Sequence, residues 1–178
     1  RPFSYLVPYS RFPMSQKVYN SLGILIKEVN TVPLVEIMPK GFAAVRVGRR
    51  NVSWRNDAPN TLMFVEAQDG GDPAKTVDFR DELFSWDVPF SKEPTSLLKV
   101  KQRFSDVYFS DHNFMLVKDS WYDTRNEKTY LVDLTTSTSK IILDRNYQDA
   151  YGDPGVFQQE KGKHGANVLV VNENKLLL

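Results

Sequence analysis

One strand-like run recurs along this chain of 178 residues at a nearly fixed spacing. Its four copies begin at residues 4, 61, 114 and 167, so successive starts are 57, 53 and 53 residues apart. The copies are Ser4–Tyr9, Thr61–Ala67, Phe114–Asp119 and Asn167–Asn172. Further short strand-like runs lie between them. A repeat of this length, built from several short strands, is typical of the blades of a β-propeller.

The order of strands within the repeat is clearest in the third copy. Phe104–Ser110 and Phe114–Asp119 flank a polar turn, Lys128–Leu134 alternates apolar and polar residues, and Lys140–Leu143 closes the unit. The second copy follows the same order, with a long excursion over Gln68–Asp81. The sequence therefore predicts an all-β fold, a partial β-propeller of about three to four antiparallel four-stranded blades. The approximate blades are 1–47, 48–101, 102–145 and 146–178, in a single segment of a propeller domain.

Both ends of the chain fall inside a predicted blade. The first blade lacks its opening strand, because Ser4–Tyr9 is followed only by Gln16–Asn20 and Ile24–Val29. The fourth begins at Gly155–Gln158 and runs out during its third strand at Lys175–Leu178. We expect a propeller that is incomplete at both ends, a piece of a longer one. The incomplete blades leave unpaired strand edges, and such edges can pair with a strand of another chain. We therefore also expect the isolated segment to self-associate.

The loops sort onto two ends of the predicted blades. The turns at one end are short and plain: Arg55–Asn60, Ser110–Asn113, Thr135–Ser139 and Lys161–Gly165. The opposite end collects the unusual segments: Gly48–Arg50, Gln68–Pro73, Ser120–Arg125 and Asp144–Pro154. Loops carried on a rigid scaffold are where binding residues concentrate, so this end is the predicted working face. The alternative is that these loops are tolerated insertions without a role.

Charge and composition exclude several classes of protein. Lys and Arg number 23 against 22 Asp and Glu, a formal net charge of +1, which argues against a nucleic-acid or anionic-membrane surface. No apolar run approaches the roughly 20 residues of a membrane-spanning helix. The chain has no cysteine, which removes disulfides, thiolate nucleophiles and cysteine zinc sites. The compartment stays open, with an exported protein as one possibility.

The residues of hydrolytic and metal chemistry are sparse. No Gly-x-Ser-x-Gly elbow occurs, and the two histidines, His112 and His164, fall in predicted turns of the plain end. Asp69-Gly70-Gly71-Asp72 has some character of a calcium loop, but it lacks alternating oxygen ligands and a closing Glu. We therefore expect no catalytic residue, no metal site and no cofactor within this segment.

Trp121, Tyr122 and Arg125 form the one candidate binding cluster. An arginine can hold a substrate carboxylate through two parallel hydrogen bonds, with aromatic rings as the walls of the site. The alternative is that Arg125 stacks on a ring only to hold its own loop in place.

Several runs of the chain resemble the N-terminal β-propeller of the glutamyl endopeptidases, in the prolyl oligopeptidase family of serine peptidases. The runs are Pro2–Pro8, Ser53–Arg55, Val65–Asp72, Glu82–Phe84, Ser120–Arg125 and Asp153–Gly155. In that family, the propeller precedes an α/β-hydrolase domain with a Ser-Asp-His triad and restricts which peptides reach it. None of the triad positions lies in this segment.

The resemblance implies a non-catalytic segment that gates peptide access to a hydrolase domain of the same chain. The parent would be a glutamyl endopeptidase or a dipeptidyl aminopeptidase-like enzyme. Its partners would be that hydrolase domain and peptide substrates, with Trp121, Tyr122 and Arg125 bordering the substrate passage. The alternative function is a stand-alone propeller that binds proteins or glycans, because exposed aromatic rings also stack on sugars.

Overall fold

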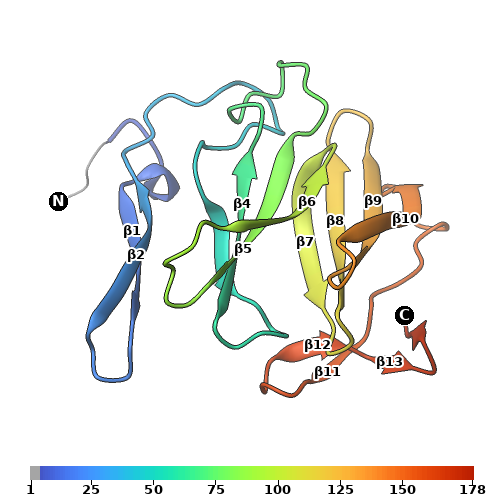
Figure 1. Cartoon of the computed structure of the whole chain (residues 1–178). Helices are drawn as coiled ribbons and strands as arrows, with labels where there is room; N and C mark the ends of the chain where they lie inside the picture. Colours follow the sequence, from blue (N-terminus) through green and yellow to red (C-terminus); the bar gives the residue numbers. More distant parts are fainter. Residues whose placement is uncertain (1–4) are drawn as a thin grey trace.

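The computed structural model describes residues 5–178, and these residues form β-strands joined by turns and loops (Figure 1). The only helical element among them is the short 3₁₀ turn η1, Tyr9–Arg11. No helix in the described part of the chain has the length and apolarity needed to cross a membrane. The strands are β1 (Met14–Tyr19), β2 (Leu25–Val32), β3 (Arg50–Trp54), β4 (Thr61–Ala67), β5 (Asp81–Asp87), β6 (Thr95–Val100), β7 (Arg103–Phe109), β8 (Phe114–Trp121), β9 (Asn126–Asp133), β10 (Thr138–Asn146), β11 (Gln159–Lys161), β12 (Asn167–Leu169), β13 (Val171–Asn172) and β14 (Lys175–Leu176).

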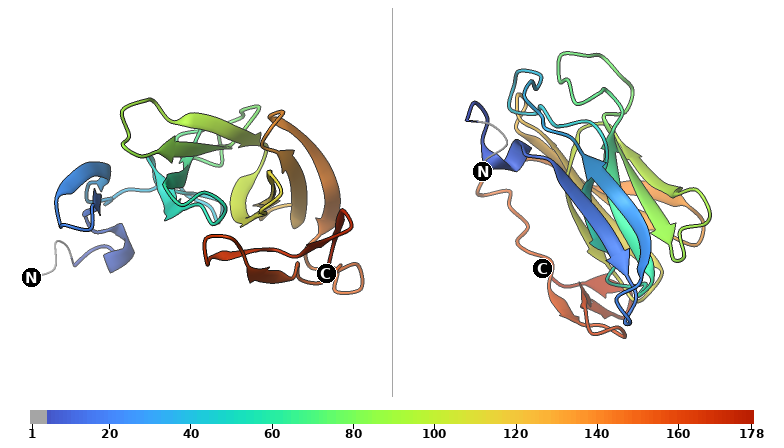
Figure 2. Two further views of the ribbon diagram at one scale, coloured as in Figure 1. Left: turned by 60° about the horizontal axis from the view of Figure 1, so that its bottom comes forward. Right: turned by 90° about the vertical axis from the view of Figure 1, so that its left-hand side faces the viewer.

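The strands pair as antiparallel meanders. Two sheets have four strands each, in the orders β3-β4-β5-β6 and β7-β8-β9-β10. Three hairpins make up the rest of the strands in residues 5–178: β1–β2 before these sheets, and β11–β12 and β13–β14 after them. The hairpins and sheets follow one another in an arc, as the left view of Figure 2 shows. This is the arrangement of successive blades in an open part of a propeller.

Apolar clusters cover both faces of the central strands in each four-stranded sheet, whereas the edge strands β3 and β10 are largely exposed. Successive strand residues point to opposite sides, so one strand contributes to two clusters. In β4, Met63 and Val65 pack toward the second sheet, whereas Leu62 and Phe64 pack toward β2 of the first hairpin. This explains why β4 reads as an almost continuous apolar run rather than an alternating one.

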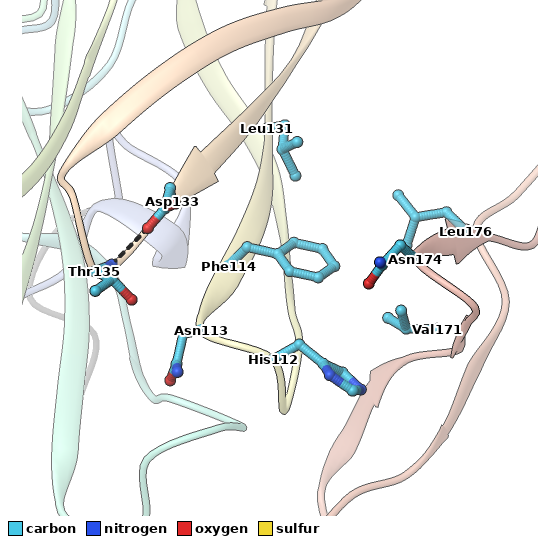
Figure 3. A pocket seen from close by; sticks show the side chains of 9 residues that line it. All are labelled: His112, Asn113, Phe114, Leu131, Asp133, Thr135, Val171, Asn174 and Leu176. Carbon is cyan, nitrogen blue, oxygen red and sulfur yellow. Dashed lines mark hydrogen bonds between the residues drawn. The ribbon is translucent and has the colours of Figure 1, made fainter.

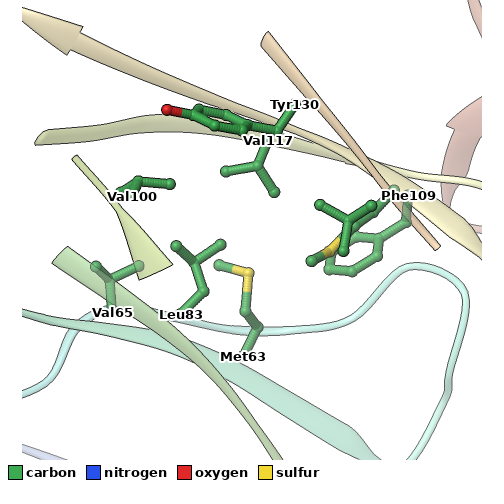
Figure 4. Close-up of a cluster of buried hydrophobic side chains, with 9 residues drawn as sticks. Met63, Val65, Leu83, Val100, Phe109, Val117 and Tyr130 are labelled. Atoms are coloured by element: carbon green, nitrogen blue, oxygen red, sulfur yellow. The ribbon is translucent and has the colours of Figure 1, made fainter. Parts of the chain in front are cut away.

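The main core lies between the two four-stranded sheets (Figure 4). Met63, Val65, Leu83 and Val100 of the first sheet meet Phe109, Met115, Val117, Tyr130 and Val132 of the second. A smaller cluster, in which Leu116 contacts Phe157 and Leu169, covers the outer face of the second sheet with the C-terminal segment. The sheets are thus stacked layers, with a separate apolar cluster between each pair of neighbouring layers.

The predicted fold class is confirmed: the chain is all-β, a partial propeller with two complete four-stranded sheets and incomplete units at both ends. The exact blade boundaries given above stay a prediction. Thr61–Ala67 and Phe114–Asp119 form the expected strands, as β4 and part of β8.

The structure corrects the repeat at its two ends. Ser4 lies outside the described residues, and Tyr5–Tyr9 forms bends and the start of η1 instead of a strand. Pro8 has no N–H group for a sheet ladder, which favours this outcome. Asn167–Asn172 divides into β12 and β13, which pair with different partners. Gly155–Gln158 is a connection, and the strand begins at Gln159.

The loops lie at two opposite ends of the stack. The turns 55–60 and 110–113 lie at the lower end in Figure 1, and the loops 68–80 and 122–125 lie at the upper end. The long connection 33–49, between β2 and β3, also crosses the upper end. We call this end the upper face; it is the end predicted to carry the working loops.

Candidate functional site

Two long segments of the upper face dock on each other through a glycine. The N–H of Val45, in the connection 33–49, donates to the carbonyl oxygen of Gly71 at 3.1 Å. A Cβ atom on Gly71 would lie 1.9 Å from the carbonyl oxygen of Val45, and its φ of +79° is in the left-handed region. Only glycine accommodates both the close approach and this backbone conformation.

A buried ion network lies beneath these loops; we call it the Asp69–Asp81 network. Asp69 is 2% exposed, and its Oδ2 accepts hydrogen bonds from Arg80 Nη1 at 2.9 Å and Arg103 Nη2 at 2.7 Å. Its Oδ1 accepts the backbone N–H of Gly71 at 2.9 Å. The network thereby fixes the loop that begins after β4.

The second carboxylate of the network, Asp81, is completely buried. Its Oδ1 accepts from Arg103 Nη1 at 3.0 Å, and its Oδ2 accepts the N–H of Phe104 at 2.9 Å. Arg50 Nη2 lies 2.7 Å from the same Oδ1, yet neither Nη2 nor Nε of Arg50 makes an aligned hydrogen bond within residues 5–178. We read this contact as an electrostatic pairing without the directional bond.

Arg103 joins both carboxylates to the rest of the upper face. Besides its bonds to Asp69 and Asp81, its Nε donates to the carbonyl oxygen of Ala43 at 2.7 Å. Since Ala43 belongs to the connection 33–49, one buried guanidinium ties three segments together. Three arginines meet two carboxylates here, which leaves a surplus of one positive charge.

The predicted residue Trp121 lies next to this network. The guanidinium of Arg80 stacks over the Trp121 ring, 4.0 Å from its centre. Cation–π stacking of this kind restrains both partners. The structure therefore links Trp121 to Asp69 through Arg80.

Tyr122 and Arg125 form a second stack at the surface. The Arg125 guanidinium lies 3.7 Å from the centre of the Tyr122 ring, and its Nη1 donates to the Tyr122 carbonyl oxygen. Phe42, which is 81% exposed, stacks on Tyr122 with 4.2 Å between ring centres. Arg125 thus contacts its own turn, which is the arrangement of the self-stacking alternative. We call these three side chains the Phe42–Arg125 stack.

A buried carboxylate that sequence reasoning missed lies in β8. Asp119 is completely buried, and its Oδ2 accepts from the N–H of Gln102 at 3.0 Å and the hydroxyl of Tyr130 at 3.1 Å. Its Oδ1 has no partner within the described residues. Burial raises the pKa of Asp119 to about 6, although both hydrogen bonds act in the opposite direction. The alternation Met115, Val117, Asp119 could have placed this carboxylate on the core face.

The lower end carries a hollow of about 360 Å³ beside the turn 110–113 (Figure 3). Phe114, Leu131, Val171 and Leu176 give it apolar walls, and His112 lies at its edge. The sequence predicted only short, plain turns at this end and did not predict the hollow. His112 and His164 are both exposed, and no hydrogen bond to either imidazole is found in residues 5–178.

No cluster of three or more potential metal-ligating side chains occurs among the residues that the structure describes. Asp69, in the run with some calcium-loop character, instead directs both carboxylate oxygens to arginine and backbone donors. Within residues 5–178, the arginines of the upper face outnumber the carboxylates that pair with them, which favours anions. The exposed ring of Phe42 offers a surface for aromatic and apolar groups.

Two curated plant proteins are similar to this chain. One, named probable glutamyl endopeptidase, chloroplastic, from Oryza sativa subsp. japonica, is 37% identical over 159 residues, or 87% of this chain and 17% of that protein. Another of the same name, from Arabidopsis thaliana, is 34% identical over 173 residues, or 95% of this chain and 18% of that protein. The chain therefore spans less than a fifth of these relatives and is related to a segment of proteins named as peptidases. No family model and no solved structure matches it.

Proposed function

We propose, from its similarity to a segment of the plant glutamyl endopeptidases, that this chain is a non-catalytic propeller segment of a serine peptidase of the prolyl oligopeptidase family. Its upper face would meet a hydrolase domain outside this chain and limit which peptides reach it. The observation that carries the proposal is the identity of 37% and 34% over most of the chain. A glutamyl endopeptidase is the first candidate for the parent, and a dipeptidyl aminopeptidase-like enzyme is the second.

The construction of the upper face supports a gating role. The Asp69–Asp81 network holds the loops from below, so the side chains above them have a fixed platform. The Phe42–Arg125 stack projects from this platform with exposed rings and a guanidinium. Rigid aromatic and cationic side chains around an opening discriminate among peptides by shape and charge.

Trp121, Tyr122 and Arg125 would border the passage, and kinetics of the longer peptidase test this placement. Arg125→Ala should lower kcat/KM on peptides with an acidic residue at the cleavage position by about fivefold, the effect of about 1 kcal/mol. Lys140→Ala is the matched control, because Lys140 is an exposed cation on β10. Unchanged kcat/KM on both acidic and neutral peptides after Arg125→Ala would refute the placement.

A stand-alone protein- or glycan-binding module is the second candidate. The observation in its favour is the exposure of Phe42 at the surface of the stack, since sugars bind on such rings. Binding of the isolated chain to an immobilised glycan, abolished by Phe42→Ala, would favour this function over the first. Binding of no glycan, together with peptidase activity of the longer protein, would dismiss it.

A further inference from the structure

Two hollows of the upper face adjoin each other and share an arginine. The larger, about 360 Å³, lies between the run 32–39 and the segment 45–47, with Gly70 beside them. The smaller, about 210 Å³, is lined by Ser10, Arg11, Val35, Met38 and Arg46. Because Val35, Met38 and Arg46 belong to both, the hollows form one depression, which we call the Arg46 groove.

The walls of the Arg46 groove are apolar and held in place. The run 32–39 supplies valine, leucine, isoleucine, methionine and proline side chains, and Ile37 is 91% exposed. Pro33 and Pro39 restrict the backbone of this run to extended conformations. The N–H of Val35 donates to the Arg11 carbonyl oxygen at 2.9 Å. A preformed apolar surface of this kind suits an extended peptide, because little ordering is needed on binding.

The charge of Arg46 is the unusual feature of the groove. Arg46 is half-buried, and no carboxylate lies within 4 Å of its guanidinium among residues 5–178. Its Nη2 donates to the Arg49 carbonyl oxygen and its Nη1 to that of Val47. By contrast, Arg49 pairs with Glu66, and the three arginines of the network pair with Asp69 or Asp81.

Neighbouring charges make the groove electropositive. Burial and the nearby Arg50 both lower the pKa of Arg46, because each disfavours its charged form. Arg11 also has no carboxylate within 4 Å in the described residues, and Glu36 is the one acidic side chain of the lining. A half-buried cation without a counter-charge is costly, and an incoming anion removes that cost.

We propose that the Arg46 groove binds an extended acidic peptide, with a carboxylate on Arg46 and apolar side chains against the run 33–38. This inference rests on the proposed function, in which the peptide would be a substrate of the parent. Apolar walls together with an uncompensated arginine favour an anion carried on an apolar chain over a small inorganic anion. The carboxylate can come from a glutamate side chain or from a peptide C-terminus.

Fluorescence anisotropy on the 178-residue chain tests the proposal. The probe is a fluorescein-labelled, C-terminally amidated heptapeptide with a central glutamate between valine and leucine residues. A second probe carries glutamine in place of glutamate, and a third carries glutamine with a free C-terminus. We expect the glutamate probe to bind about tenfold more tightly than the amidated glutamine probe. If only the third probe binds more tightly than the amidated glutamine probe, the carboxylate that the groove recognises is a peptide C-terminus. Equal affinity of all three probes overturns the proposal.

Arg46→Gln should remove this preference by weakening binding of the glutamate probe about tenfold, without changing binding of the amidated glutamine probe. Lys140→Gln is the matched control and should change neither affinity. A preference that survives Arg46→Gln overturns the proposal. A second copy of the chain could instead occupy the groove, and light scattering at the assay concentrations tests this alternative. A dimer that Arg46→Gln breaks and that the peptide leaves intact would also overturn the proposal.

Glu36→Gln keeps the test decisive if Arg46→Gln fails to fold. Glu36 is exposed and has no ion pair within the described residues, so its replacement should leave the fold intact. Removing this negative charge from the groove should tighten binding of the glutamate probe about threefold and leave the glutamine probe unchanged. No tightening would contradict the proposal. Such a failure leaves the peptidase assignment standing, because serine-hydrolase activity of the longer protein tests that assignment separately.

Discussion

Replacing Asp69 with asparagine should lower the free energy of unfolding by about 3 kcal/mol. The carboxylate is 2% exposed and accepts bonds from Arg80, Arg103 and the N–H of Gly71. Removing one partner of a buried pair costs about 3–5 kcal/mol, because the other charges stay buried without compensation. Arg103 keeps its bonds to Asp81, so we expect the lower end of that range.

Urea unfolding followed by tryptophan fluorescence measures this loss. In a thermal melt of a domain of this size, the same loss of about 3 kcal/mol would lower Tm by roughly 6–12 °C. Asp133→Asn is the matched control, since Asp133 accepts hydrogen bonds from the exposed residues Thr135 and Thr136, and it should cost less than about 1 kcal/mol. If Asp69→Asn costs no more than Asp133→Asn, the network does not hold the upper face together.

Three further predictions follow from particular contacts. Gly71→Ala should destabilise the fold by more than about 2 kcal/mol, because its Cβ would clash with the Val45 carbonyl oxygen. Gly23→Ala is the control: Gly23 has a similar φ but open space around it, so this change should cost only about 1 kcal/mol, and equal losses in thermal melts would contradict the clash. Burial raises the folded-state pKa of Asp119 to about 6, so the stability of the chain should fall as pH rises from about 4 to about 7. Asp119→Asn removes this titration and should therefore gain about 2 kcal/mol relative to the unmodified chain between pH 4 and pH 7. Urea unfolding that gives the same stability difference between the two chains at both pH values would contradict it. The isolated chain should form dimers or larger species, and Leu25→Lys on the exposed first hairpin should reduce their fraction. Size-exclusion chromatography with light scattering that shows a clean monomer over a wide concentration range would refute this prediction.

The strands of the central sheets follow from local pattern, whereas the ends of the repeat do not. Runs such as Thr61–Ala67 and Thr95–Val100 have enough apolar and β-branched residues to identify them as strands. Tyr5–Tyr9 has a similar composition, but a strand also needs a partner for its backbone groups, which a short apolar run cannot specify. Sequence periodicity therefore locates the interior of the stack better than its edges.

The candidate site was only partly predictable for a related reason. Because loops alternate between the two ends of an antiparallel meander, the sequence predicted which loops share the upper face, and Trp121, Tyr122 and Arg125 lie there. That this face is the working face stays a prediction. The partners of these residues, Arg80 and Phe42, come from distant loops. Long-range pairing of this kind leaves no mark in local spacing, so the Asp69–Asp81 network and the Arg46 groove became visible only in three dimensions.

Labelling of the proposed parent protein with a fluorophosphonate probe, followed by mass spectrometry of the modified peptide, tests most directly whether the chemistry lies outside these residues. We predict a single modified serine beyond the segment aligned with residues 1–178, and no labelling of the isolated 178-residue chain. A modified serine within this segment, or a longer protein that the probe does not label, would contradict the proposed role.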